Sequence, residues 1–355
     1  MASEPGSERP HVARVVEDGW NLGLAVVLTR VGWGHRVVGH VGYGGAGFVR
    51  VLARVLRAAP GSEPSSDGAL LQRRGWRNFV TAEALATPVR VEVGGQVHEA
   101  LTDRSGNLDV RLPNPGLEPG WHHARVSVPG GGVQATAESP LLVVGEETRL
   151  GIVSDIDDTV LTTLLPRPLL AAYHTFVARE EARRPVPGMA ELYAGIVAGT
   201  GDGSAQVPTV YVSTGAWNTA ATLRRFLARE GLPSGPMLLT DWGPTNTGWF
   251  RSGRDHKAEC LRTLARDLPH VAWVLVGDDG QHDPTIYADF ARSHPGNVRA
   301  IALRELSMSQ QVLASGSPLP REEAGEEAGV PEIPEVRGAD GHELAARLLP
   351  LLAGA

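Results

Sequence analysis

Three aspartates, Asp155, Asp157 and Asp158, follow the apolar run 151–154 near the middle of the chain. Short apolar runs bounded by polar residues are typical of central parallel strands, and ligands of open α/β sheets bind just beyond the carboxyl ends of such strands. Carboxylates this close repel one another unless they share a cation or a proton. Mg²⁺ is the simplest shared cation, because it binds carboxylates and substrate phosphate oxygens and retains water ligands.

Two other interpretations of these aspartates need to be weighed. A calcium-binding loop also begins D-x-D, but it requires Gly at its sixth position and Glu at its twelfth. Those positions hold Val160 and Pro166, so the pattern excludes a calcium loop. A solvated acidic turn after a strand is the remaining alternative, and the residues downstream bear on it.

Polar groups also begin or end three further predicted elements. The strands 209–212 and 271–276 each end in them, and the helix 255–268 carries them in its first turn. Parallel strands joined by short turns have their carboxyl ends at one edge of a sheet, so we expect these groups to lie beside Asp155. They are Ser213, Thr214, Gly215, Lys257, Asp278, Asp279 and Asp283.

Lys257 is the single lysine among the 33 Lys and Arg residues of the chain. Its ammonium is a compact point charge that a planar guanidinium does not replace. Phosphoryl transfer to a carboxylate uses such a charge, together with a hydroxyl, to hold the phosphoryl oxygens, while Mg²⁺ offsets the repulsion between two anions. The set of residues therefore favours metal-assisted phosphoryl transfer to an aspartate over a solvated acidic turn.

The first part of the chain predicts a helix followed by a β domain. Residues 1–38 form an N-terminal helical segment, because apolar residues recur there at helical spacing. We favour docking of this helix on the next domain over an interfacial helix held by Trp20 and Trp33, since a dense Lys/Arg flank is missing. Residues 39–147 alternate with period two between glycine-rich turns, which is typical of an antiparallel β-sandwich domain.

The rest of the chain belongs to the α/β class. In residues 148–312 strands alternate with helices, which predicts a doubly wound parallel sheet. Residues 161–186 are a small cap inserted into it. Residues 313–338 form an acidic linker rich in Pro and Gly, and residues 339–355 form a C-terminal helix that packs back on the body.

The totals restrict the partner and the location. A net charge of −7 and a pI near 6.0 argue against nucleic acid as a partner. The one cysteine, Cys260, excludes an internal disulfide framework and fits a reducing compartment. The apolar run 22–28 is too short to span a bilayer, and Glu4 and Glu8 lie where a signal peptide would be positively charged. We therefore expect a cytoplasmic protein without a transmembrane segment.

The order of these motifs resembles the haloacid-dehalogenase (HAD)-like phosphatase superfamily, in which D-x-D-x-T is followed by Ser or Thr, then Lys, then G-D with a further Asp. Longer stretches within residues 40–305 resemble the actin-patch-associated phosphatidate phosphatase family. They are I-V-S-D-I-D-D-T, V-P-G-M-A-E-L-Y, Y-V-S-T-G-A-W, G-L-P-S-G-P-M-L-L, H-K and V-G-D-D-G-Q-H-D-P-T-I-Y. In one departure, Thr214-Gly215 stands where we expect Asn-Ser. The resemblance implies a HAD-like fold with a small cap.

The resemblance also implies a catalytic role for four residues. Asp155 would be the nucleophile that forms an aspartyl-phosphate. Asp157 would protonate the leaving alkoxide and then activate water, as a general acid and base. Ser213 would donate a hydrogen bond to a phosphoryl oxygen, and Lys257 would neutralise the phosphoryl group and the nucleophile.

Mg²⁺ is the cofactor that the resemblance implies. The backbone carbonyl of Asp157 would be one ligand of the metal. The carboxylate of either Asp279 or Asp283 would contact the metal through a water molecule. The expected metal ligands together are Asp155, Asp157, Asp278, Asp279 and Asp283. The expected substrate-binding residues are Thr159, Thr214 and Gly215.

The expected substrate follows from the size of the cap. Only the segment 161–184 separates the first motif from the next framework helix, and by resemblance sites without a large cap accept bulky substrates. We expect a phosphorylated lipid, with phosphatidate converted to diacylglycerol at a membrane surface by a peripherally bound enzyme. A phosphoprotein or another soluble phosphomonoester is the alternative substrate. A non-catalytic binding module, whose β domain holds an unidentified protein, is the alternative of another class.

Overall fold

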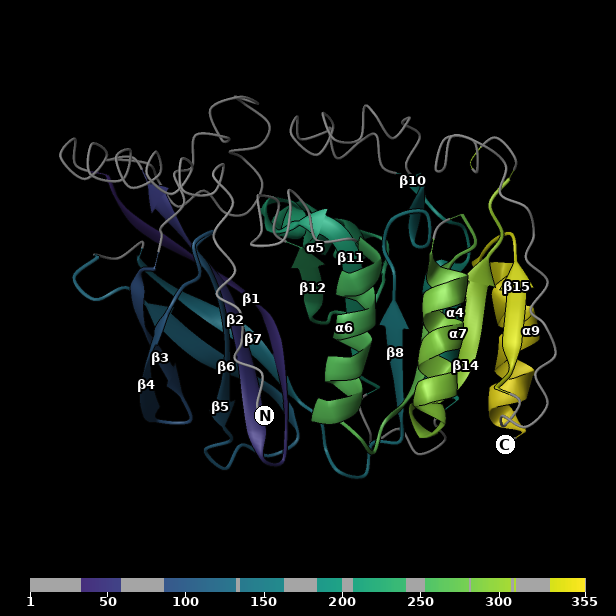
Figure 1. Ribbon diagram of the computed structural model, residues 1–355, viewed down its shortest axis with the longest axis horizontal. Coiled ribbons are helices and arrows are strands. Elements are labelled where there is room, and N and C mark those ends of the chain that lie inside the picture. Colours follow the sequence, from purple (N-terminus) through teal and green to yellow (C-terminus); the bar gives the residue numbers. More distant parts are fainter. Residues whose placement is uncertain are drawn as a thin grey trace, which may run out of the picture.

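The computed structural model has two parts, a β domain followed by an α/β domain (Figure 1). Most of the predicted N-terminal helical segment, cap and linker lies outside the residues that the structure describes. Residues 34–38, which the sequence places in the helical segment, form a strand instead, because they pair with residues 54–58. The described residues are 33–58, 86–131, 135–162, 184–199, 207–240, 253–280, 282–307, 310 and 333–354.

Seven strands form one sheet in the β domain, in the order β4-β3-β6-β7-β1-β2-β5. In β3, Val89, Val91 and Val93 are buried and alternate with exposed residues, as expected of a half-buried strand. Gly94 and Gly95 have φ of 53° and 77°, which the tight turn into β4 requires. The strands are β1 (Gly34–Gly45), β2 (Phe48–Ala58), β3 (Pro88–Val93), β4 (Gln96–Leu101), β5 (Asn107–Pro113), β6 (Gly120–Ser127) and β7 (Thr136–Val143).

This sheet is continuous, whereas the sequence predicts the two facing sheets of a sandwich. Its described strand pairs are antiparallel except for β1 with β7, which is parallel. β1 and β2 have 12 and 11 residues, and the register of their pairing shifts between His40 and Tyr43. Long strands with a bulge coil strongly, so one sheet can curl around a core of its own.

β8 (Leu150–Ser154) lies at the centre of a six-stranded parallel sheet in the order β12-β11-β8-β13-β14-β15. From β8 the chain adds β11 and β12 on one side of the sheet, and it then adds β13, β14 and β15 on the other side. The direction in which strands are added therefore reverses between β8 and β13. Ligands of open α/β sheets bind at the carboxyl ends of the strands at such a switch point. The other strands are β11 (Thr209–Ala216), β12 (Met237–Thr240), β13 (Ala272–Asp278), β14 (Val298–Arg304) and β15 (Glu335–Gly338).

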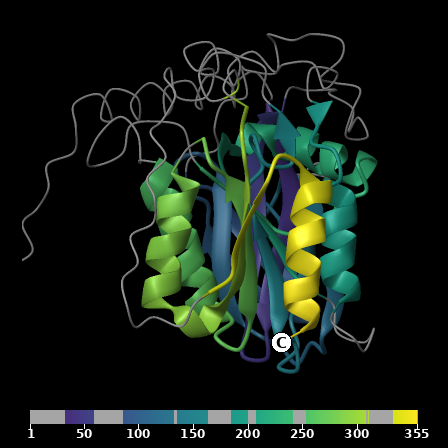
Figure 2. The ribbon, with the colours of Figure 1, turned by 90° about the vertical axis from the view of Figure 1, so that its right-hand side faces the viewer.

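Helices cover both faces of the parallel sheet (Figure 2). α6 and α7 pack on the face shared with the β domain, and α4, α5 and α9 pack on the other face. In the described part of the chain, no helix is long and apolar enough to cross a membrane. The helices are α4 (Met189–Ala198), α5 (Ala220–Arg229), α6 (Gly253–Asp267), α7 (Asp283–Ser293) and α9 (Gly341–Ala353), with short 3₁₀ turns η4 (Trp217–Thr219) and η5 (Pro295–Asn297).

The C-terminal elements complete the parallel sheet. β15 lies inside the segment 313–338 that the sequence predicts to be a linker, and it pairs in parallel with β14. α9 then begins at an N-cap, because the Asp340 carboxylate accepts hydrogen bonds from the amides of His342 and Glu343 at 3.0 Å each. Its apolar side packs into the core on the α4 face, as expected for the C-terminal helix.

The β domain is joined to α6 by a shared core and by polar contacts. Tyr43 and Phe48 lie in the same apolar cluster as Leu264 and Leu268 of the α/β domain. The Tyr43 hydroxyl also donates a hydrogen bond to Asp267, the last residue of α6, at 2.8 Å. The β domain therefore supports the helix that carries Lys257 near its opposite end.

Candidate active site

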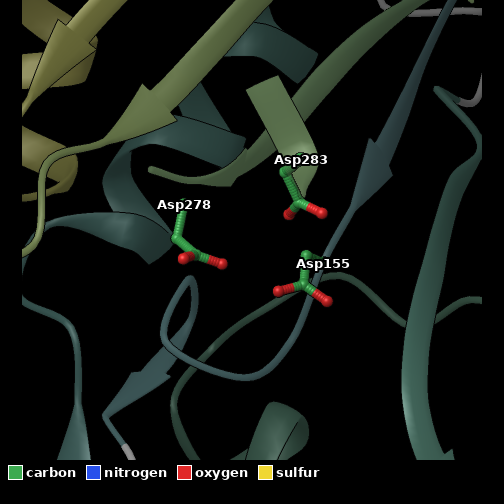
Figure 3. A group of neighbouring side chains, drawn as sticks. All are labelled: Asp155, Asp278 and Asp283. Atoms are coloured by element: carbon green, nitrogen blue, oxygen red, sulfur yellow. The ribbon is translucent and has the colours of Figure 1, made fainter. Parts of the chain in front are cut away.

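Side chains from four elements meet at the carboxyl edge of the parallel sheet. Asp155 follows β8, Asp278 ends β13, Asp283 begins α7 and Lys257 lies near the start of α6. All four are buried, with exposed fractions of 2, 0, 0 and 5% in that order. Figure 3 shows the three carboxylates grouped around one space. The structure thus brings together side chains from three separate parts of the sequence, at Asp155, at Lys257 and at 278–283.

Lys257 is held between two of these carboxylates. Its Nζ lies 2.6 Å from Oδ1 of Asp283 and 3.0 Å from Oδ1 of Asp155. Burial lowers the pKa of Lys257, but the charges of Asp155, Asp283 and Asp278 raise it by more, so the net shift is upward. The ammonium is therefore charged at physiological pH, and the buried carboxylates give it the pairing that a buried cation requires.

Gly277 allows Asp283 to approach β13. A Cβ atom at position 277 would lie 2.6 Å from Oδ2 of Asp283 and 2.7 Å from Cε2 of Tyr287. The Tyr287 hydroxyl donates a hydrogen bond to the carbonyl of Val276 at 3.1 Å, which holds α7 against the strand. The glycine before Asp278 is thus required by the close packing of α7 on β13 at the site.

The residues after β8, 155–162, form a tight turn that we call the aspartate loop. The amides of Val160 and Leu161 both donate to the carbonyl of Ile156, at 3.0 and 3.2 Å. Asp158 has a φ of 58°, in the left-handed region that Asp tolerates better than most residues. The turn keeps Asp155 buried and leaves Asp157 half-buried.

Hydroxyl groups contact both predicted catalytic aspartates. Thr159 Oγ1 donates to Oδ2 of Asp155 at 3.3 Å. Ser213 Oγ donates to Oδ2 of Asp157 at 3.0 Å and accepts a hydrogen bond from the amide of Gly215 at 2.9 Å. Asp157, in the loop after β8, and Ser213, in the neighbouring strand β11, are therefore in direct contact.

Two other predicted site residues have different surroundings. The carbonyl of Thr214 accepts a hydrogen bond from Thr240 at 2.8 Å, so its backbone is tied to β12. Oδ1 of Asp279 accepts a hydrogen bond from the amide of Leu306 at 2.8 Å. Of the two aspartates that the sequence leaves as alternatives for the metal, Asp283 and not Asp279 lies in the group of buried carboxylates.

Burial, together with neighbouring negative charges, raises the pKa values of Asp155 and Asp278. The pKa of Asp155 is raised to about 8, because burial and the charges of Asp283 and Asp157 together outweigh the opposing charge of Lys257. Burial and the charges of Asp283 and Asp155 likewise raise the pKa of Asp278 well above its ordinary value. A single ammonium therefore does not balance the three buried carboxylates, and a further cation or a proton is needed.

A divalent cation fits this need. Asp155, Asp278 and Asp283 each offer an oxygen, and these atoms lie within 4.8 Å of one another. Oδ2 of Asp278 and Oδ2 of Asp283 are buried and have no hydrogen-bond partner among the described residues. Buried carboxylate oxygens without partners are costly unless they bind a cation. The three aspartates can therefore hold a metal that prefers oxygen ligands.

Sequence reasoning missed two buried residues that contact the aspartate loop or its strand. Arg304 donates a hydrogen bond to the carbonyl of Asp158 at 2.7 Å. The hydroxyl of Tyr193 lies 2.7 Å from Oγ of Ser154, which itself donates to the carbonyl of Asp155. A charged residue directly after the apolar run 300–303 is a signal for Arg304, whereas nothing in the sequence distinguishes Tyr193 from the apolar residues of its helix.

The sequence of this half of the chain is similar to known phosphatases. Residues 150–305 match the family model described as phosphatidate phosphatase APP1, catalytic domain. Phosphatidate phosphatase APP1 of Saccharomyces cerevisiae is 26% identical over 167 residues, which are 47% of this chain and 27% of the yeast protein. An uncharacterized protein of Schizosaccharomyces pombe is 24% identical over 172 residues, which are 48% of this chain and 27% of that protein. The match thus spans about a quarter of the length of these relatives.

Among solved structures, a carbohydrate acetylesterase from Xanthomonas citri is 13% identical over 79% of this chain and 74% of its own. Its TM-score is 0.20, which is too low to indicate a common fold. The similarity that bears on function is therefore in the sequence of residues 150–305, which contain all four of the buried charged residues described above.

Proposed function

We propose that this protein is a HAD-type phosphatase that hydrolyses phosphatidate to diacylglycerol, because residues 150–305 match the family model of the phosphatidate phosphatase APP1 catalytic domain. The observation that carries the proposal is the position of Lys257, whose ammonium is within 3.0 Å of Asp155 and Asp283 at the switch point of the parallel sheet. An ammonium beside buried carboxylates is suited to bind a phosphoryl group next to a carboxylate nucleophile.

The reaction proceeds in two steps. An oxygen of Asp155 attacks phosphorus, so that a bond from the carboxylate to phosphorus forms while the bond from phosphorus to the ester oxygen breaks. The leaving alkoxide takes a proton from Asp157 and departs as diacylglycerol. Water then attacks the aspartyl-phosphate and gives a proton to Asp157, which releases inorganic phosphate and restores both aspartates.

The contacts of the two aspartates suit these roles. Lys257 and Thr159 both contact the carboxylate of Asp155, which orients one of its oxygens for attack. Asp157 is half-buried, so it can reach both the leaving group and a water molecule. Ser213 now donates to Asp157, and the same hydroxyl would turn to a phosphoryl oxygen when substrate is bound. The neighbouring residues 214 and 215 would line the phosphoryl pocket.

Mg²⁺ is the metal that we assign to the buried aspartates. Asp155, Asp278 and Asp283 would hold it, with the backbone carbonyl of Asp157 as a further ligand. When bound, Mg²⁺ would offset the repulsion between the carboxylate nucleophile and the phosphate dianion. Asp279 would contribute indirectly, because its contact with the amide of Leu306 secures the loop after β13.

A bulky lipid substrate is supported by the connection at the edge of the site. β9 (Leu161–Thr162) and β10 (Arg184–Pro185) pair with each other in an antiparallel ladder, so the intervening segment leaves and re-enters the domain at one place. The insertion between them has 21 residues (163–183), which is short for a domain that would enclose a substrate. We therefore propose action at a membrane surface on the cytoplasmic side.

Phosphate release tests the proposal directly. Wild-type protein with Mg²⁺ should release phosphate from vesicles containing phosphatidate, and Asp155→Asn should reduce the rate by about 1000-fold or more because the nucleophile is removed. Asp289→Asn is the matched control, since Asp289 is an exposed residue of α7 that pairs with Arg254 and Arg292. Chelation of the metal should abolish the wild-type rate.

The outcomes separate the alternatives. Hydrolysis of p-nitrophenyl phosphate without hydrolysis of phosphatidate would remove the lipid assignment and leave a phosphatase of soluble monoesters or phosphoproteins. No phosphate release from any of these substrates would favour a binding module instead.

A further inference from the structure

Arg304, the last residue of β14, connects three segments at the edge of the site. Its side chain is buried, with 6% of the residue exposed. Nη1 donates to the carbonyl of Asp158 at 2.7 Å, Nε donates to the carbonyl of Ala339 at 3.2 Å, and Nη2 donates to Oε1 of Gln310 at 3.3 Å. The guanidinium thus joins the aspartate loop to the connections on either side of β15.

The contact with Asp158 is at the centre of the aspartate loop. Asp158 lies between Asp157 and Thr159, two of the residues assigned to the reaction, and its φ of 58° is left-handed. A non-glycine residue in this conformation needs support from its surroundings. The hydrogen bond from Arg304 to the Asp158 carbonyl provides such support from outside the loop.

The backbone of Arg304 is tied to the metal-binding side of the site. Arg304 is paired with Asp278 in the register of β14 with β13. Its carbonyl accepts a hydrogen bond from the amide of Asp279 at 3.0 Å. One residue therefore holds the position of Asp278 through its backbone and the position of the aspartate loop through its side chain.

The three acceptors explain why the residue is an arginine. A guanidinium is a rigid fork that donates in several directions at once, whereas an ammonium is a single point from which flexible donors extend. Burial lowers the pKa of the Arg304 guanidinium, and the negative charges of Asp158, Asp278, Asp279 and Asp340 around it oppose this shift. Lysine would keep the charge but would not reach all three acceptors.

We propose that Arg304 is a positioning residue, which sets the distance between the aspartate loop and Asp278 without touching the substrate. The inference rests on the proposed function, because the loop carries the nucleophile and the general acid. A misplacement of the reacting groups by about 1 Å can lower the rate about 100-fold. Loss of the guanidinium should therefore reduce kcat and leave substrate affinity largely unchanged.

Arg304→Ala and Arg304→Lys test this role, with Arg299→Ala as the matched control. Arg299 lies on the same strand and is only partly buried. In Arg304→Ala we expect kcat to fall about 10- to 100-fold with KM changed less than about threefold. Free guanidinium ion, at concentrations too low to denature the protein, should restore part of the kcat lost in Arg304→Ala. The same additive should not raise the kcat of the wild type or of Arg299→Ala.

Hydrogen exchange gives a readout that does not depend on activity. In Arg304→Ala, the backbone amides of 155–162 should exchange about tenfold faster or more, while those of β11 and of the control protein stay as in the wild type. The exchange experiment tests the role of Arg304 even if the wild type hydrolyses no phosphate ester. Absence of hydrolysis would refute the proposed function but not the support of the aspartate loop by Arg304.

Three results would overturn the role of Arg304. The first is a kcat of Arg304→Ala within about twofold of wild type. The second is unchanged exchange in 155–162. The third is failure of both Arg304→Ala and Arg304→Lys to fold, because the residue would then support the whole domain rather than the loop.

Discussion

Replacing Lys257 with Met should destabilise the metal-free protein in a way that depends on pH. The ammonium lies 2.6 Å from Asp283 and 3.0 Å from Asp155, and all three groups are buried. Met has a similar length but no charge, so the variant removes the cation with little change in volume. The remaining carboxylates, which include Asp278, must then compensate for one lost positive charge.

The magnitude follows from the proton that replaces the ammonium. In the folded variant one further carboxyl must be protonated, whereas in the unfolded chain that carboxyl has an ordinary pKa of about 4. Holding a proton on such a group at pH 7 costs about 1.4 kcal/mol for each of about three pH units, or about 4 kcal/mol in all. This agrees with the loss of about 3–5 kcal/mol on removal of one partner from a buried ion pair.

The pH dependence has a definite sign. On folding, the variant takes up one more proton than the wild type does, so its stability relative to wild type falls by about 1.4 kcal/mol for each unit of rising pH. The difference in free energy of unfolding should therefore be about 4 kcal/mol at pH 7 and about 1.4 kcal/mol at pH 5. The charge balance of Lys257 with Asp155 and Asp283 predicts this slope.

Guanidinium unfolding in the presence of a chelator measures the effect. Tryptophan fluorescence reports on the α/β domain, because Trp273 is fully buried in β13. Arg262→Met is the matched control on the same helix, since its pair with Glu259 is exposed and should contribute less than about 1 kcal/mol. A difference of the same size at pH 5 and pH 7 for Lys257→Met, or one below about 1 kcal/mol at pH 7, would refute the reasoning.

Two further predictions concern the three carboxylates that we propose to bind the metal. Mg²⁺ at about 100 times its dissociation constant should stabilise the wild type by about 2.7 kcal/mol. Asp278→Asn and Asp283→Asn should lose this stabilisation, whereas Asp279→Asn should keep it. Equal loss in all three variants would show that the group of three aspartates is not the metal site. Gly277→Ala should lower stability by about 1–3 kcal/mol and weaken Mg²⁺ binding, because its Cβ would lie 2.6 Å from Asp283 and 2.7 Å from Tyr287. Thermal unfolding with and without Mg²⁺ measures both effects, and an alanine variant as stable and as responsive to Mg²⁺ as the wild type would contradict the second.

The sequence was informative where a site residue directly follows a buried strand. Asp155, Ser213 and Asp278 each follow a short run of mainly apolar residues, and the strands predicted there are β8, β11 and β13. A strand buried on both faces has to be apolar throughout, so the first charged or hydroxyl residue after it marks the edge of the sheet. Local pattern is enough to find such residues.

Other features depend on partners that are distant in sequence. β15 has only four residues, and it is a strand because β14 supplies its hydrogen bonds. The seven strands of the β domain alternate as a sandwich would, and their joining into one sheet depends on the pairing of β1 with β7. Neither feature has a distinct local pattern.

The choice between Asp279 and Asp283 shows the same division. Both follow β13 within a few residues, and the sequence does not separate them. The direction of α7, which packs against Gly277, places Asp283 beside Lys257. Asp279 instead accepts a hydrogen bond from the amide of Leu306, in the connection after β14. By itself, the sequence determined which residue types border the sheet edge and the order in which they occur, because buried strands require apolar residues and the polar residues that follow them are therefore visible in the sequence. Only the tertiary structure decided which of them meet, and it added Arg304, because such contacts depend on how separate strands and helices pack together.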